Sequence, residues 1–172
     1  MDLLLYYGFI FVVYGYLGWG LENLFSYCVS GHRQEEGFLY SYFKPMYAFA
    51  MAILIYINNT IHNFWILLVG AFIIPTAIEF ITGVIMRYYF KKDYWDYSKQ
   101  KLNYKGLVCL EFSFYWMLLV FFTIGVIQPF ILDYIFKFLK PIWKIVLPVQ
   151  MIVLMFDFIL TVNRFKFKRK II

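Results

Sequence analysis

Five apolar stretches, separated by short polar segments, dominate this sequence and restrict the folds open to it. They run at residues 3–27, 45–61, 64–86, 106–127 and 145–163. A helix of about 20 apolar residues crosses the hydrocarbon core of a bilayer. Backbone groups in lipid must bond within their own segment, so helices satisfy such stretches and open sheets do not. The sequence therefore predicts an all-α, polytopic membrane helix bundle with about five transmembrane helices.

The overall composition excludes a soluble globular domain. Hydrophobic residues make up 63% of the chain, charged residues 15%, and the mean hydropathy is +0.70. Five spans use most of the 172 residues, so we expect a single transmembrane domain over residues 1–172. No basic segment precedes the first apolar stretch and no small-residue cleavage pattern follows it, so we expect it to remain as a membrane helix.

Lysine and arginine are distributed unevenly between the polar segments. Segments 29–44, 87–105 and 164–172 together hold 13 of them, whereas 128–144 holds 3. Cytoplasmic loops carry the excess of basic residues, so this distribution predicts an N-terminus outside and a C-terminus in the cytoplasm. The final basic and aromatic run, Arg164–Lys170, lies beside a span. It therefore favours anionic lipid over nucleic acid as its partner.

The polar segment before the last span has a helical pattern. Its charged residues recur at steps of four, three and four: Asp133, Lys137, Lys140 and Lys144. Such spacing draws one polar stripe along a helix. This pattern predicts an interfacial helix near 129–143, with a re-entrant segment or a sixth short span as the alternative.

Four carboxylates lie inside the apolar stretches, namely Glu22, Glu79, Glu111 and Asp157. With the predicted orientation, all four lie roughly 7–11 Å from the cytoplasmic face. An acid at the centre of a membrane helix costs roughly 2.5–3.5 kcal/mol, so each needs a partner, water, a proton or a function. Two interpretations remain open. The acids either snorkel or pair separately with bases such as Arg87 or Lys105, or they line one polar cavity that binds a cation or a cationic substrate.

Other chemistry has little support in the sequence. The two cysteines, Cys28 and Cys109, show no metal or redox spacing, and His32 has no partner for a metal site. We therefore expect no metal and no cofactor. No Gly-rich phosphate loop of the GxxxxGK[ST] kind is present, so an ATPase would have to be a separate chain. The cluster Trp95-Asp96-Tyr97-Ser98 predicts an ordered turn rather than a solvated loop.

Several motifs together resemble a known family. They are Gly18-Trp19, Glu22, Gly37-Phe38-Leu39, Pro45, Tyr47, Glu79, Thr82-Gly83, Trp95-Asp96-Tyr97-Ser98, Asn103, Gly106, Cys109-Leu110, Ser113 and Trp116. This pattern, over about residues 15–120, resembles the putative ABC-transporter type IV permease family. The resemblance implies a small polytopic protein of the bacterial cytoplasmic membrane, a component of a transporter. It marks as binding-site candidates Glu22, Glu79, Trp95, Asp96, Tyr97, Ser98 and Asn103.

The sequence departs from the family pattern where charges are reversed, at Glu35-Glu36, Arg87 and Glu111. Swapped partners of one ion pair would produce such reversals. We therefore predict that Arg87 pairs with Glu111, or alternatively with Glu36.

Three functions fit these observations. The first is a permease or membrane subunit of a transporter, with an acidic polar site near the cytoplasmic side. Five short helices barely enclose a path, so we expect a homo-oligomer or a complex with other chains. The second is a membrane enzyme acting on lipid-linked substrate, although no catalytic constellation supports it and a non-enzyme is favoured. The third is a non-catalytic assembly or regulatory membrane protein.

Overall fold

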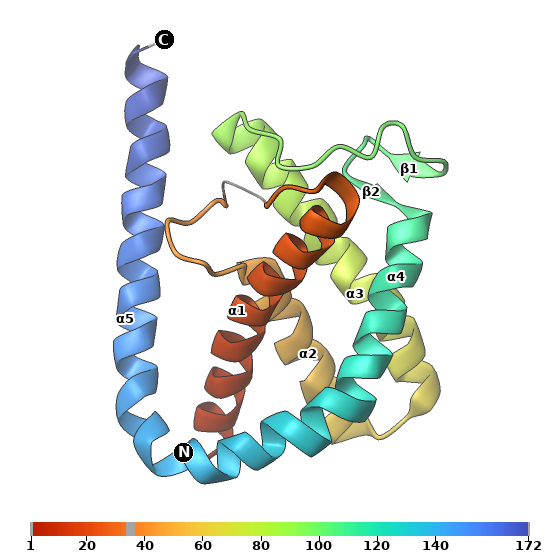
Figure 1. Cartoon of the computed structure of the whole chain (residues 1–172), viewed down its shortest axis with the longest axis vertical. Coiled ribbons are helices and arrows are strands. Elements are labelled where there is room, and N and C mark those ends of the chain that lie inside the picture. The colour runs from red at the N-terminus through yellow and green to blue at the C-terminus, as the bar shows by residue number, and fades with distance from the viewer. Residues whose placement is uncertain (1, 34–36, 172) are drawn as a thin grey trace. The chain divides into compact units, whose positions relative to one another are not determined.

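The computed structural model describes residues 2–33 and 37–171, with side chains described as far as Phe167. The described chain is all-α apart from one two-stranded hairpin, which confirms the all-α part of the predicted fold class (Figure 1). The helices belong to two compact units. Unit 1 comprises Met1–Ala48 and Phe138–Ile172, and unit 2 comprises Phe49–Lys137.

Unit 1 contains α1 (Asp2–Ser30) and most of α5 (Asp133–Ile171), with the loop at 37–44 between α1 and the start of α2. The ring of Phe43 packs against Gly15 of α1, and Tyr47 packs against Gly18. A small cluster of buried residues, Leu39, Phe43, Ala48 and Leu154, joins the loop to α5. Burial of these side chains holds the loop in place between the helices.

Unit 2 contains most of α2 (Pro45–Ile61), followed by α3 (Phe64–Ile85), the π-helical turn η1 (Met86–Phe90), α4 (Leu110–Phe122) and the π-helical segment η2 (Thr123–Leu132). Asn63 caps α3, because its Oδ1 accepts hydrogen bonds from the backbone of Trp65 at 2.9 Å and Ile66 at 3.1 Å. Lys91, in the left-handed conformation, ends η1. The chain then turns back into a segment without helix.

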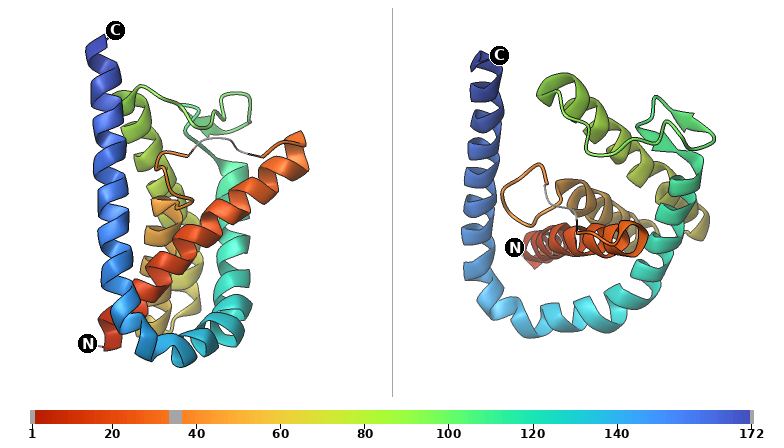
Figure 2. Two further views of the ribbon diagram at one scale, coloured as in Figure 1. Left: turned by 60° about the vertical axis from the view of Figure 1, so that its left-hand side comes forward. Right: turned by 45° about the horizontal axis from the view of Figure 1, so that its top comes forward.

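That segment, residues 91–109, is called the connection, and it runs from the end of η1 to the start of α4 (Figure 2). It ends in an antiparallel hairpin of β1 (Asn103–Tyr104) and β2 (Val108–Cys109). The N–H of Leu107 donates to the carbonyl oxygen of Tyr104 at 3.0 Å, closing the turn. Its two central residues, Lys105 and Gly106, both have positive φ, as in the type I′ turns that suit hairpins.

Three helical runs of the described chain are long and apolar enough to cross a membrane: Asp2–Ser30, Phe64–Phe90 and Leu110–Phe167. The apolar helix Pro45–Ile61 is shorter, at 17 residues. The third run has 58 residues and contains both of the last two predicted spans. Segment 129–143 is helical, as predicted, and is part of this continuous run; its position at the membrane interface stays a prediction. The number of crossings stays a prediction.

Candidate functional site

A buried carboxylate, Glu79, lies at the centre of unit 2. Its side chain is on α3, and only 3% of the residue is exposed. The hydroxyl of Tyr97 donates to Oε1 at 2.9 Å, and the indole Nε1–H of Trp116 donates to Oε2 at 3.0 Å. One acid therefore ties together α3, the connection and α4.

The chain direction explains why these residues meet. Helices α3 and α4 pack against each other and are joined by the connection. Glu79 lies six residues before the end of α3, and Trp116 lies six residues after the start of α4. Because α3 and α4 pack antiparallel, residues near the end of one helix meet residues near the start of the other. The ring of Tyr97 packs on Phe112 of α4 with centroids 4.7 Å apart, which directs its hydroxyl toward Glu79.

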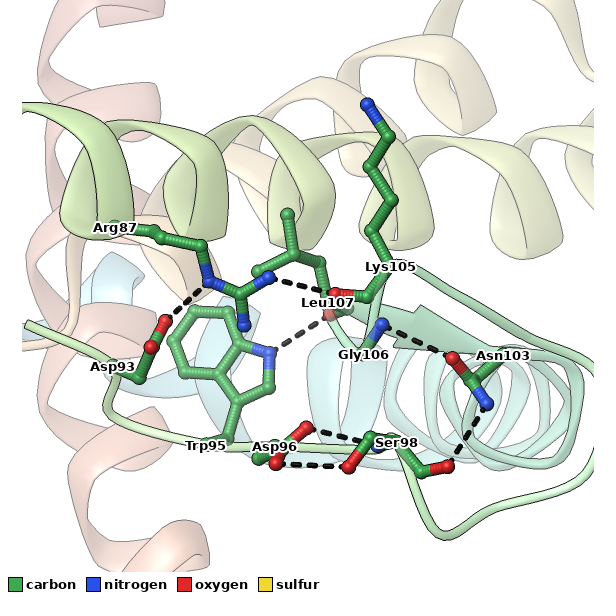
Figure 3. Close-up of polar contacts among 9 residues, drawn as sticks. All are labelled: Arg87, Asp93, Trp95, Asp96, Ser98, Asn103, Lys105, Gly106 and Leu107. Carbon is green, nitrogen blue, oxygen red and sulfur yellow. Dashed lines mark hydrogen bonds and ion pairs between the residues drawn. The ribbon is translucent and has the colours of Figure 1, made fainter.

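Asp96, Ser98 and Asn103 bond within the connection (Figure 3). The Asp96 carboxylate accepts the backbone N–H and the hydroxyl of Ser98, both at 2.9 Å. Asn103 Oδ1 accepts the N–H of Gly106 at 3.0 Å, and its Nδ2 donates to the carbonyl oxygen of Gln100 at 2.8 Å. The backbone N–H of Ser98, followed by its hydroxyl, lowers the pKa of the Asp96 carboxyl from its ordinary value. These contacts make the predicted ordered turn.

Trp95 fixes the connection to the end of α3. Its indole N–H donates to the carbonyl oxygen of Leu107 at 2.8 Å. A Cβ at Gly83 would lie 2.9 Å from Leu107 Cδ2 and 3.2 Å from Trp95 Cζ2, so only glycine permits this close approach. Gly106 is constrained further, since it has a φ of +68° and a Cβ there would lie 2.6 Å from Asp96 Oδ1.

The predicted ion pair of Arg87 with Glu111 is wrong. The Arg87 guanidinium instead pairs with Asp93 through Nε at 2.6 Å, and its Nη1 donates to the carbonyl oxygen of Lys105 at 2.7 Å (Figure 3). Asp93 is close because the chain reverses just after η1. Glu111 accepts from the hydroxyl of Tyr115, one turn along its own helix, at 2.8 Å. The alternative partner, Glu36, lies outside the described residues.

The two other acids of the apolar stretches belong to unit 1. Glu22 pairs with Lys44, which directly precedes the second apolar stretch. Asp157 accepts the backbone N–H groups of Tyr40 at 2.9 Å and Ser41 at 2.8 Å. The Thr161 hydroxyl adds a longer bond of 3.3 Å to Asp157. These two carboxylates thus hold the loop at 37–44 to α1 and α5.

The structure brings together six of the seven candidate residues in unit 2: Glu79, Trp95, Asp96, Tyr97, Ser98 and Asn103. Glu22 lies in unit 1. Sequence reasoning did not assign Trp116 and Lys44 as partners of acids. The antiparallel pairing of α3 with α4 could have identified Trp116. Among the described residues, no group of three or more His, Cys, Asp or Glu side chains could hold a metal ion.

Comparison with known proteins gives one match. A family model described as Putative ABC-transporter type IV matches residues 9–162. The match therefore extends beyond the resemblance at about 15–120 and through most of the last apolar stretch. No curated protein and no solved structure matches the chain.

Proposed function

The chain belongs to the Putative ABC-transporter type IV family, and from this premise we propose that it is a permease or membrane subunit of a transporter whose polar site is centred on Glu79. The family and the apolar helices fit a membrane protein of a transporter. Two points go beyond that statement and are our proposal: the permease role, and the position of the acidic site near the cytoplasmic side.

The observation that carries this proposal is the bonding of the Glu79 carboxylate. The side chain is buried, and its two oxygens accept from Tyr97 and Trp116, which are both neutral donors. These two donors orient the carboxylate and join it to the connection and to α4. A buried carboxylate that is held in one orientation can bind a cation, a proton or a cationic group of a substrate. Tyr97 belongs to the connection, so movement of the connection would change access to the acid.

The membrane arrangement is part of the same proposal. Five crossings, with the N-terminus outside and the C-terminus in the cytoplasm of a bacterial cell, would place the connection at the cytoplasmic face of the membrane. An ATPase would bind from that side as a separate chain. The chain forms one transmembrane domain, and several copies or other membrane subunits would complete the path for a solute.

Co-purification and ATP hydrolysis test this function. The tagged full-length chain is isolated from native membranes in mild detergent, its ATP-binding partner is identified by photolabelling with an azido-ATP, and the complex is placed in nanodiscs. We expect Glu79→Gln to retain the partner but to lower ATP hydrolysis at least about tenfold, equivalent to 1.4 kcal/mol of coupling. Tyr97→Phe should lower it less, because one donor remains.

Glu111→Gln is the matched control, since Glu111 is an exposed acid of α4 bonded along its own helix. It should leave ATP hydrolysis unchanged. The proposal fails if no ATP-binding protein co-purifies, or if the Glu79→Gln complex hydrolyses ATP at the wild-type rate.

A second candidate is an assembly or regulatory membrane protein without transport activity. The hydrogen bonds within the connection support it, because Asp96, Ser98 and Asn103 bond to one another and to neighbouring backbone. In this case Glu79→Gln would lower the thermal stability of the chain, and ATP hydrolysis by any co-purified partner would stay unchanged.

A further inference from the structure

The connection has an excess of positive charge on its surface. It contains five lysines and two acids. Both acids are engaged in bonds described above, Asp93 with Arg87 and Asp96 with Ser98. Four of the lysines are exposed: Lys91, Lys99, Lys101 and Lys105. The acids therefore do little to offset the lysines at this surface, which suits an anionic partner.

An apolar side chain projects from the middle of this basic surface. Leu102 is 76% exposed and lies between Lys101 and the hairpin. Its φ of +52° is in the left-handed region, which a leucine rarely adopts. Two bonds fix the turn: the N–H of Gln100 donates to Tyr97 O at 2.8 Å, and Asn103 Nδ2 donates to Gln100 O at 2.8 Å. The turn therefore holds an exposed leucine beside lysines.

Contacts with α3 set the position of this turn relative to the membrane. The ring of Tyr104 lies beside Phe80 of α3, with centroids 5.6 Å apart. Phe80 is seven residues before Arg87, or about 10 Å along the helix. The hairpin thus lies alongside the last turns of a membrane-length helix and does not extend away from it. In the proposed topology this end of the helix lies at the headgroups, where tyrosine and lysine are favoured.

We propose that the Ser98–Tyr104 turn is a binding surface for anionic lipid headgroups. Lys99 and Lys101 contact the phosphates, and Leu102 inserts among the upper acyl carbons. A soluble acidic protein offers charge but no acyl layer for Leu102 at this depth, so the bilayer is the better match. Binding would fix the connection, and with it Tyr97, over Glu79.

A fluorescent label in the turn tests the proposal in the full-length chain. Gln100→Cys in a Cys28→Ser background carries an environment-sensitive dye, because Gln100 is exposed and its backbone makes the bonds that fix the turn. Cys109 is 2% exposed, and the Cys28→Ser parent measures any labelling there. Nanodiscs are made from phosphatidylcholine alone or with added phosphatidylglycerol. Acrylamide, a neutral quencher, reports exposure of the dye to water.

We expect blue-shifted emission and weaker quenching in the anionic nanodiscs. Lys99→Gln with Lys101→Gln should weaken this association about fivefold for each lysine. Leu102→Asn should also weaken it, and asparagine suits the left-handed conformation, so the turn itself stays folded. The control pair Lys137→Gln with Lys144→Gln removes the same charge from two exposed lysines elsewhere and should have no effect on the label.

The proposal is overturned if the label reports the same environment in both lipid compositions. It is also overturned if Leu102→Asn and the double lysine variant leave the emission unchanged. Exposure to water in both nanodiscs, followed by shielding on addition of a purified soluble partner, would assign the surface to protein instead.

Discussion

The two units of the molecule bury the same kind of group and stabilise it by different means. In unit 1, Asp157 accepts backbone N–H groups of a loop and Glu22 pairs with Lys44. In unit 2, Glu79 accepts from the side chains of Tyr97 and Trp116. A carboxylate that is bonded to a lysine or to backbone N–H groups stabilises the fold, because the loss of that partner would cost free energy of folding. In the proposed function, movement of the connection would change the bond between Tyr97 and Glu79.

The largest expected effect breaks the ion pair of unit 1. Lys44→Met leaves Glu22 without its base, and the side chains of this pair are only 12% and 22% exposed. Removing one partner of a buried pair costs about 3 kcal/mol. Thermal unfolding of the purified chain in detergent measures the loss. The double variant with Glu22→Gln should recover much of it.

Lys140→Met is the control for this prediction. Lys140 pairs with Asp2 in the same unit, but the side chains are 37% and 69% exposed. Exposed pairs contribute about 0–1 kcal/mol. Equal destabilisation by the two methionine variants would show that burial of the Glu22 pair has no energetic importance.

The next effect concerns Asp157. In Asp157→Asn the amide NH2 of the new side chain faces one of the two backbone N–H groups of Tyr40 and Ser41, so a hydrogen bond is lost. An unsatisfied buried donor costs about 2 kcal/mol. Hydrogen–deuterium exchange of the loop at 37–44 should become faster. Thr161→Val removes only the longer bond and should change exchange less; the reverse order would contradict this assignment.

A smaller effect is expected at Glu79. In Glu79→Gln the new amide keeps one acceptor oxygen and is neutral beside two neutral donors, so the substitution should cost about 1 kcal/mol. Thermal unfolding under the conditions used for Lys44→Met gives the comparison directly. If Glu79→Gln lowers the free energy of unfolding as much as Lys44→Met does, Glu79 stabilises the fold as the acids of unit 1 do. The difference between the two units would then not hold.

The sequence predicted the fold class and the local turn because these depend on neighbouring residues. Apolar runs of span length indicate helices, and the Trp95–Ser98 cluster indicates a turn. The sequence predicted a helix near 129–143 but not that it is continuous with the apolar stretches on both sides, because Pro129 and Pro141 resemble stops. The π-helical geometry of η2 carries the helix past Pro129.

Partners distant in sequence were the harder part of the site. Sequence reasoning did not pair Lys44 with Glu22, because this pairing depends on how the loop at 37–44 folds back on α1. Arg87 was assigned to Glu111 from reversed charges alone. The left-handed Lys91 at the end of η1 turns the chain and brings Asp93 closer. The antiparallel pairing of α3 with α4 could have identified Trp116 as a partner of Glu79.

The smallest effect tests the corrected ion pair of Arg87. Its side chain and that of Asp93 are 27% and 52% exposed, so solvent and salt screen their attraction. Asp93→Asn should therefore cost only about 0.5 kcal/mol, and the difference from wild type should shrink as salt is raised. Arg87 keeps its second bond, to the carbonyl oxygen of Lys105, so the connection should remain attached to α3. Thermal unfolding at two salt concentrations measures both effects. A loss approaching that of Lys44→Met would mean that this exposed pair, rather than Glu79, holds unit 2 together.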